Sequence, residues 1–240
     1  MTHALASTTI AATLGGIGTA CWAAMHPAAQ LFGPVLRYTG SPDTLALTFD
    51  DGPNPHVTPA LLRLLERYRV RATFFVIGRH VRACPELVRE IAACGHALGN
   101  HTDTHPNLIW LGRDRIRQEL MRCQRAVLEA SGRRPLWVRP PYGYRGPQLR
   151  TVVCTGGWRG VALWSRNGFD WKPQPAHSLI ARLGQVQTGD IVLLHDGAPE
   201  DLRADRWHVV RALEYWLPRW LDRGWRLVTL DDVTTAAFCA

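Results

Sequence analysis

From Ser41 onward, short runs rich in β-branched and aromatic residues alternate with amphipathic stretches, and no linker interrupts them. The predicted strands are Leu45–Asp50, Ala72–Ile77, Ala97–His101, Leu136–Arg139, Val161–Ser165, Ile191–His195 and Arg226–Leu230. The predicted helices are Pro59–Arg69, Val81–Cys94, Arg113–Ser131, Pro147–Thr155, Ser178–Gln187 and His208–Arg223. Seven such alternations favour one α/β domain with a parallel sheet. A chain of 240 residues with 46% apolar composition can bury one large core of this kind.

An open doubly wound sheet and a closed barrel both fit this alternation, and the polar residues at the strand ends separate them. Carboxylates, histidines and an arginine fall at or just beyond the C-terminal ends of different strands, spread over almost the whole series. An open sheet concentrates its site at one switch point, whereas a closed barrel gathers every strand end around one mouth. We therefore predict a distorted (β/α) barrel with about seven parallel strands.

The first 40 residues form a separate N-terminal apolar segment, and the predicted domain covers residues 41–240. Residues 1–36 contain no Asp, Glu, Lys or Arg, and Ala4–Met25 is long enough to cross a bilayer. Threonines and glycines dilute its apolarity, and no basic residue precedes it. We expect a membrane anchor or an export signal here, and hence a cell-envelope protein. The alternatives are a helix that packs on the domain and a cytoplasmic location.

The charge and the cysteines exclude several classes of partner and site. The formal net charge is +8, and Lys172 is the only lysine among the 28 basic residues, so the other 27 are arginines. No basic run with interleaved aromatic residues appears, so we expect no nucleic-acid binding; a negatively charged envelope polymer or a simply solvated surface explains the arginines at least as well. The six cysteines show no CxxC spacing, which argues against a zinc knuckle or a redox pair. Several fall in helical patterns, where we expect small buried apolar groups.

Two adjacent carboxylates, Asp50 and Asp51, follow the apolar run Leu45–Leu47 and precede a Gly-Pro turn. Like charges side by side at the end of a buried strand are costly, so they indicate a cation, a substrate or a proton transfer more than a surface turn. His101 and His105 lie four residues apart after another predicted strand. Alone, this pair is as consistent with two exposed histidines as with a site. Combined with a strand-end carboxylate, it predicts a two-histidine, one-carboxylate metal site with open positions for water and substrate.

Three further strand ends carry residues suited to catalysis. Arg139 precedes a rigid Pro-Pro turn and could clamp a carboxylate bidentately, or simply be a satisfied loop residue. Asp170 and Trp171 place a carboxylate beside an indole in a glycine-containing loop, where the indole could stack on a sugar or cover the core. His195 ends an apolar strand; if it reaches the same mouth as the metal triad, it is a general acid or base.

The order of these motifs resembles that of the polysaccharide deacetylase family, the NodB-homology carbohydrate esterases. The resemblance rests on Thr48–Pro53, His101–His105, Arg139–Tyr142, Asp170-Trp171 and Leu193–His195, and it spans about Leu45 to Leu230. It implies a distorted (β/α) barrel that hydrolyses N-acetyl groups of N-acetylglucosamine polymers such as peptidoglycan or chitin. It also implies one divalent metal ion, zinc first, with cobalt, nickel or manganese as alternatives.

The resemblance assigns a role to each motif residue. Asp50 is implied as the catalytic base, His195 as the catalytic acid, and the metal ligands as Asp51, His101 and His105. Arg139 is implied to orient the base and Asp170 to tune the acid, while Tyr142 and Trp171 contact the substrate, Tyr142 through its backbone N–H. The family's fourth motif often begins with Asp, and here that position is Asn167, which bears on the polarity of the groove.

Two other functions remain open at this point. One is an O-deacetylase of acetylated polysaccharide, which needs less help from His195 because an alcohol leaves more easily than an amine. The other is a catalytically silent, glycan-binding member, against which the complete set of proton-transfer and metal residues argues. We expect the protein to act as a monomer on an acetylated amino-sugar polymer or oligomer.

Overall fold

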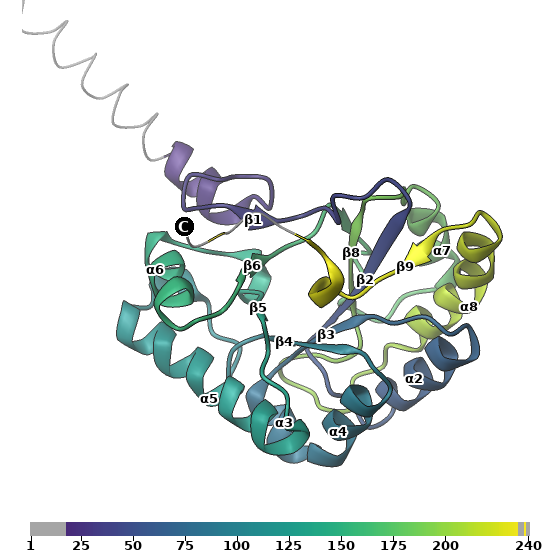
Figure 1. Cartoon of the computed structure of the whole chain (residues 1–240), viewed down its shortest axis with the longest axis horizontal. Helices are drawn as coiled ribbons and strands as arrows, with labels where there is room; N and C mark the ends of the chain where they lie inside the picture. Colours follow the sequence, from purple (N-terminus) through teal and green to yellow (C-terminus); the bar gives the residue numbers. More distant parts are fainter. Residues whose placement is uncertain (1–17, 235–237, 239–240) are drawn as a thin grey trace, which may run out of the picture.

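The computed structural model describes residues 18–234 and 238, and these form a curled, nine-stranded parallel sheet with helices outside it (Figure 1). The strands are β1 Val35–Leu36, β2 Thr44–Asp50, β3 Thr73–Val76, β4 Ala97–Asn100, β5 Trp137–Val138, β6 Gly160–Ala162, β7 Arg166–Asn167, β8 Ile191–His195 and β9 Arg226–Leu227. All their pairings are parallel. The predicted parallel α/β barrel is confirmed, with nine strands in the described chain instead of about seven.

The extra strands arise at one place where the barrel is irregular. The predicted strand Val161–Ser165 is shorter in the structure, as β6, which pairs with β5 and with the short β1. The unpredicted β7 follows just after Ser165 and pairs with β8. Between them, the Ser165 N–H donates to the Ile191 carbonyl at 3.0 Å. One extended segment thus joins the two ends of the series β5-β4-β3-β2-β8 and closes the distorted barrel.

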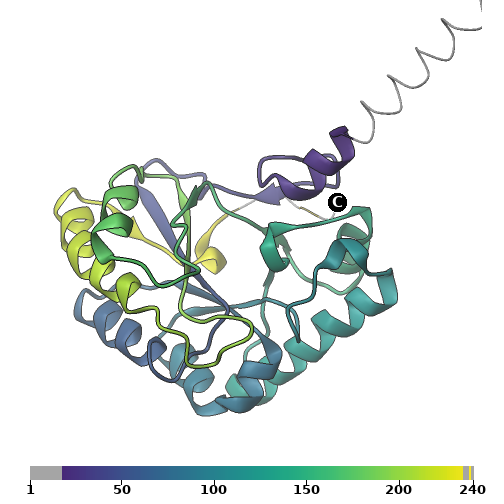
Figure 2. The ribbon, with the colours of Figure 1, turned by 180° about the vertical axis from the view of Figure 1, so that it is seen from behind.

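The helices form an arc around the outside of the sheet, seen from both sides in Figures 1 and 2. They are α2 Thr58–Arg67, α3 Gly78–Ala83, α4 Pro85–Ala93, α5 Arg113–Ser131, α6 Pro147–Thr155, α7 Ala176–Leu183 and α8 Trp207–Asp222, with 3-10 turns at Leu108–Trp110, Pro141–Gly143 and Leu230–Asp232. The predicted single helix Val81–Cys94 is wrong, because Pro85 begins a second helix there and cannot continue the first. Most other predicted boundaries lie within about two residues of those observed, a normal scatter for helix ends.

Strand alternation sorts the side chains of β2 into two sets. Leu45, Leu47 and Phe49 pack outward against the helices in the main core. Ala46, by contrast, belongs to a second apolar cluster with Phe75, Trp137 and Ile191. Because side chains alternate along a strand, Thr48 and Asp50 lie on the same side as Ala46. The interior of the barrel therefore has an apolar layer at one end of β2 and a polar layer at the other.

The described part of the N-terminal segment lies against the barrel, on the side away from the helical arc (Figures 1 and 2). The buried guanidinium of Arg145 donates to the backbone carbonyls of His26 and Ala29, and the Arg145 N–H donates to the Ala24 carbonyl. Most of the predicted membrane-associated run, residues 4–25, lies outside the described residues, and the domain boundary at residue 41 stays a prediction. In the part of the chain that the structure describes, no helix is both long and apolar enough to span a membrane.

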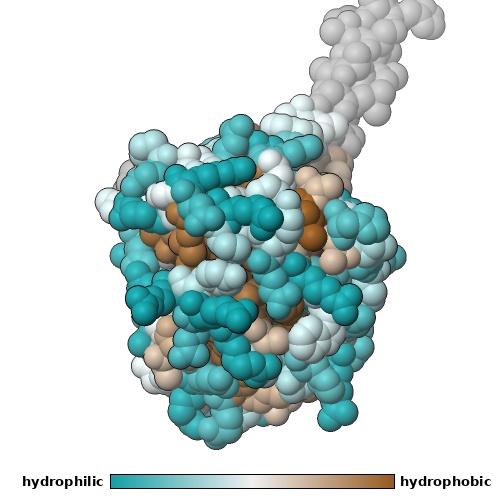
Figure 3. All heavy atoms as spheres, turned by 90° about the vertical axis from the view of Figure 1, so that its right-hand side faces the viewer, coloured by the Kyte–Doolittle hydropathy of each residue, from teal (hydrophilic) through white to brown (hydrophobic). Residues whose placement is uncertain are grey.

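Hydrophilic side chains cover most of the face in Figure 3, and hydrophobic ones appear there in small separate patches.

Among the cysteines, Cys123 is buried in α5, but Cys21 and Cys94 are exposed, so the expectation of buried apolar cysteines holds only in part.

Candidate active site

The two adjacent aspartates leave the end of β2 in different directions. Asp50 is the last residue of the strand and pairs in register with His195 at the end of β8, so both side chains enter the barrel mouth. Asp51 follows with a positive φ of 72°. Four other non-glycine residues with positive φ, Thr102, His105, Tyr142 and Phe169, lie in loops of the same mouth. Strained backbone concentrated in this way is typical of functional sites.

Arg139 holds the Asp50 carboxylate from behind. Its Nη1 donates to Asp50 Oδ1 at 2.8 Å and to Thr48 Oγ1 at 2.7 Å, while its other nitrogens donate to the Ala162 and Leu163 carbonyls. The guanidinium is fully buried and lies over the Phe75 ring. Burial lowers the pKa of Arg139, and the charge of Asp50 opposes that change. The fixed guanidinium aims one carboxylate oxygen and leaves the other, Oδ2, facing the mouth.

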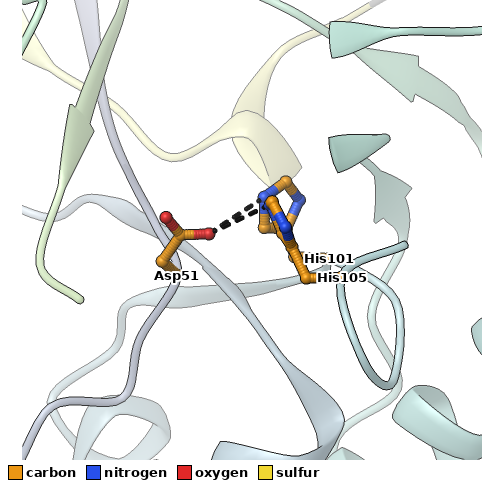
Figure 4. Close-up of side chains that lie close together, drawn as sticks. All are labelled: Asp51, His101 and His105. Carbon is orange, nitrogen blue, oxygen red and sulfur yellow. Dashed lines mark ion pairs between the residues drawn. The ribbon is translucent and has the colours of Figure 1, made fainter. Parts of the chain in front are cut away.

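Asp51, His101 and His105 bring three buried ligand atoms within 4.8 Å of one another (Figure 4). Asp51 Oδ1 lies 3.4 Å from His101 Nε2 and 3.3 Å from His105 Nε2. It has no hydrogen-bond partner among the described residues. Tetrahedral Zn²⁺ with bonds of roughly 2.0–2.2 Å separates its ligand atoms by about 3.3–3.6 Å, so these three residues fit a divalent ion. The HxxxH pair comes from a loop and not from a helix.

Hydrogen bonds around the triad prepare its atoms for a cation. His101 Nδ1 donates to the Arg139 carbonyl at 2.7 Å, so Nε2 is the ring atom that faces Asp51. Burial lowers the pKa of His105 to about 3, so this imidazole is neutral, as a metal ligand must be. Burial would raise the pKa of Asp51, but the imidazoles of His101 and His195 outweigh it and hold the pKa well below its usual range.

His195 and Asp170 form a second hydrogen-bonded pair at the mouth. His195 Nδ1 lies 2.9 Å from Asp170 Oδ1, and the His195 backbone N–H donates to Asp170 Oδ2 at 2.7 Å. Burial acts to lower the pKa of His195, but Asp170, Asp51 and Asp50 outweigh it and raise the pKa to about 9. The imidazole therefore carries a proton at neutral pH, and its Nε2 is free to deliver that proton into the mouth.

A cavity of about 410 Å³ joins these groups. The predicted site residues that line it are Asp50, Asp51, His101, His105, Tyr142, Trp171 and His195. Arg139 and Asp170 lie behind the wall, hydrogen-bonded to Asp50 and His195. The Tyr142 N–H makes no hydrogen bond within the described chain, whereas the next two N–H groups donate to Pro140 and Pro141. The structure thus brings together all nine residues that the sequence singled out.

The structure adds supporting residues that the sequence analysis missed. Arg206 lines the cavity and donates to the Trp171 carbonyl at 2.5 Å, while His208 Nε2 lies 3.0 Å from the Asp170 carbonyl. Both come from the start of α8 and fix the loop that carries Asp170 and Trp171. His80 Nδ1 likewise donates to the Asp51 carbonyl at 3.0 Å. A basic residue near a helix start was the only sequence signal, and it is too common to be specific.

Two other residues, Asp196 and Asn167, shape the loops around the site. Asp196 is fully buried, accepts a hydrogen bond from Thr58 and packs against Gly52, where a Cβ would collide with its carboxylate. Burial raises the pKa of Asp196 to about 7. Asn167, the departure from the fourth motif, accepts a hydrogen bond from the Phe169 N–H at 2.7 Å. It shapes the turn before Asp170, and an aspartate could make the same bond.

Known proteins resemble this chain in sequence and in architecture. The sequence matches the polysaccharide deacetylase family over residues 37–160. A chitooligosaccharide deacetylase of Sinorhizobium fredii is 39% identical over 81% of this chain and 93% of its own. The crystal structure of a peptidoglycan N-acetylglucosamine deacetylase superposes with a TM-score of 0.74 at 32% identity, over 85% of this chain and 92% of the other.

A third protein extends the comparison to ester substrates and metals. A family 4 acetyl xylan esterase from Clostridium thermocellum, solved with a cobalt ion, superposes with a TM-score of 0.70 at 30% identity, over 79% of this chain and 89% of the other. The sequence match covers more than half of the present chain, and the solved structures share its curled parallel sheet. The chain therefore belongs to the polysaccharide deacetylase family.

Proposed function

We propose that this polysaccharide deacetylase removes N-acetyl groups from glycans that contain N-acetylglucosamine, with the help of one divalent ion. The observation that carries the proposal is the cavity in which the Asp51, His101 and His105 triad faces both Asp50 and His195. A base, an acid and an incomplete ligand set around one space are what hydrolysis of an unreactive amide requires. The named activities of the relatives on chitooligosaccharide and peptidoglycan support this substrate class.

Asp51, His101 and His105 would hold the metal, which we propose to be Zn²⁺. When bound, it supplies Lewis acidity for a water and for the acetyl carbonyl. Asp50 takes the proton of the attacking water, and Arg139 keeps its carboxylate in position. Because Asp50 Oδ1 is held by Arg139, the proton goes to Oδ2, the oxygen that faces the cavity.

Other residues of the cavity serve the oxyanion and the departing amine. The Tyr142 N–H, which has no partner in the described chain, is placed to donate to the tetrahedral oxyanion. His195 protonates the amine nitrogen, without which an amine leaves poorly, and Asp170 stabilises the imidazolium before this step. Trp171 is 46% exposed beside this histidine and offers its face to a sugar ring.

The proposed function and its metal are tested together by mass spectrometry of chitotetraose and peptidoglycan fragments after incubation with the protein. We expect a loss of acetyl groups, about one divalent ion per chain, and reversible inactivation by a chelator. His101→Ala should lose the metal and the activity, whereas His177→Ala, an exposed histidine on α7, should retain both. Full metal content and turnover in His101→Ala would contradict the ligand assignment.

An O-deacetylase is the second candidate, supported by the similarity to an acetyl xylan esterase. The Asp170–His195 pair favours the N-deacetylase, because an alcohol leaving group gains little from a pre-protonated imidazole. Acetylated xylan oligomers in the same mass-spectrometric assay decide between the two. A higher rate constant kcat/KM on acetyl xylan than on chitotetraose would replace the first proposal by the second.

We also propose that the protein works at the cell envelope. The uncharged run at residues 4–25 supports this location, as does the peptidoglycan substrate named for a relative. Full-length protein should sediment with membranes or appear outside the cytoplasm after cell fractionation, and a variant lacking residues 1–17 should not. Recovery of the full-length protein entirely in the soluble cytosol would overturn this location.

A further inference from the structure

A second cavity, of about 330 Å³, lies beside the catalytic one. The two share Trp164 and Asn167 as a common wall, in the segment that closes the barrel. The other walls of the second cavity come from the end of α7 and from residues 26–37 of the N-terminal segment. A glycan that occupies the catalytic cavity therefore has this space within reach of its neighbouring groups.

The second cavity is cationic. Arg37, Arg166 and Arg182 line it, and no aspartate or glutamate is among its described lining residues. Asp190, just outside, pairs with Arg166 at 3.1 Å and balances that charge. Arg37 and Arg182 have no carboxylate partner in the described chain. Two uncompensated positive charges thus face one space, which we call the arginine pocket.

Both of these guanidiniums are fixed in place by neutral acceptors. Arg37 Nε donates to the Trp164 carbonyl at 3.1 Å, and Arg182 Nη1 donates to the Gly168 carbonyl at 3.0 Å and to Gln174 Oε1 at 2.7 Å. These acceptors orient the guanidiniums without neutralising them. The remaining N–H groups, both Nη of Arg37 and Nε and Nη2 of Arg182, make no hydrogen bond to the described protein. A pre-oriented guanidinium with free N–H groups matches the oxygens of a carboxylate or a phosphate.

An aromatic ridge connects the two cavities. Trp171 lines the catalytic cavity and Phe169 lines the arginine pocket, with ring centroids 5.5 Å apart and 46% and 55% exposure. The two exposed rings are inclined at 56° and offer a sugar an apolar surface between the cavities. The ridge therefore gives a glycan a path from the acid His195 toward the two guanidiniums.

On this basis we infer that the arginine pocket binds an anionic group of the glycan, a carboxylate or a phosphate, close to the acetamido sugar that is deacetylated. The inference rests on the proposed function and narrows its substrate class to acidic glycans. A neutral chitin chain would fill the catalytic cavity equally well, but it would leave Arg37 and Arg182 without a counterpart.

The test compares three glycans of equal length: neutral chitotetraose, a tetrasaccharide with muramic acid carboxylates, and chitotetraose with a reducing-end phosphate. We expect the wild type to prefer at least one acidic glycan by about tenfold in kcat/KM, mainly through a lower KM, since one charge-assisted contact is worth about this much. High salt should reduce the preference. The preferred acidic glycan tells whether the pocket takes a carboxylate or a phosphate.

Arg37→Gln should reduce the ratio of kcat/KM for the acidic glycan to that for chitotetraose by about tenfold. Arg122→Gln, on the exposed face of α5, should leave this ratio at the wild-type value and controls for net charge. Equal kcat/KM values on all three glycans, or an unchanged ratio in Arg37→Gln, would overturn the inference and leave the proposed function intact. No acetyl release from any of the three would instead overturn the proposed function.

Discussion

Asp50→Asn should lower the rate of deacetylation by about 10²–10⁴-fold while the protein keeps its metal. The asparagine oxygen can still accept from Arg139, so the geometry around position 50 is retained, but the amide cannot take a proton from water. The measurement is kcat on chitotetraose together with the metal content of the purified protein. Asp50 lies 3.7 Å from His101 Nε2 but outside the three-ligand group, which is why we expect the metal to stay.

Asp51→Asn should lose activity and metal together, because it removes the anionic ligand between His101 and His105. The two variants differ by one position and make the same chemical change, so each serves as the reference for the other. Asp43→Asn, which breaks only an exposed ion pair with Arg226, is the matched control and should behave as wild type. Equal metal loss in the Asp50 and Asp51 variants would show that the base and the ligand are assigned wrongly, and His195 or a water would then have to be considered as the base.

His195→Gln should impair the release of an amine much more than the release of nitrophenolate. Glutamine retains polarity at this position but has no proton to give, so hydrolysis of the acetamide should fall by about 10²–10⁴-fold. Hydrolysis of p-nitrophenyl acetate should fall much less, because a nitrophenolate leaves without protonation. A similar loss on both substrates would mean that His195 acts before the leaving step, for example in positioning the water.

Asp170→Asn should move the alkaline limb of the pH–rate profile to lower pH. In the wild type the pKa of His195 is raised to about 9, so the acid is protonated at neutral pH and is lost as the pH rises through this value. Removal of the Asp170 charge takes away the main contribution that opposes burial, and the pKa of His195 must fall. An alkaline limb that stays in place would show that another group controls it.

The bounds of helices and strands could be predicted from the sequence where the hydrophobic pattern and the residues at the ends of an element agreed. Helices α5 and α6 begin and end at the predicted residues, and β8 matches its predicted range. The short β7 could not be predicted from the sequence, because the change of partner from β5 to β8 between β6 and β7 depends on how the barrel closes. The break between α3 and α4 did have a signal in Pro85, which the continuous apolar pattern obscured.

The nine candidate residues could be identified because they lie at or shortly after the ends of predicted strands and their order resembles that of the family's motifs. The residues that hold these nine in place could not be identified from the sequence. His80, Arg206 and His208 form hydrogen bonds to the backbone carbonyls of distant loops. Every residue has a backbone carbonyl, so the sequence does not show which one accepts. The arginine pocket was hidden for the same reason: Arg37 and Arg182 are 145 positions apart in the sequence and meet only when the N-terminal segment docks beside α7.

The polar layer inside the barrel favours activity at a cost to the stability of the fold. Below it, Ala46, Phe75 and Trp137 fill the barrel with apolar side chains, while Asp50 and Arg139 occupy the next level as a fully buried ion pair. Replacing such a pair by well-packed apolar residues is often neutral or stabilises a protein by about 1–4 kcal/mol, whereas removing only one partner is strongly destabilising. A chain released from selection for catalysis could therefore gain stability by repacking both positions at once. Under the mechanism proposed above, the buried Asp50–Arg139 pair serves turnover and not the stability of the barrel.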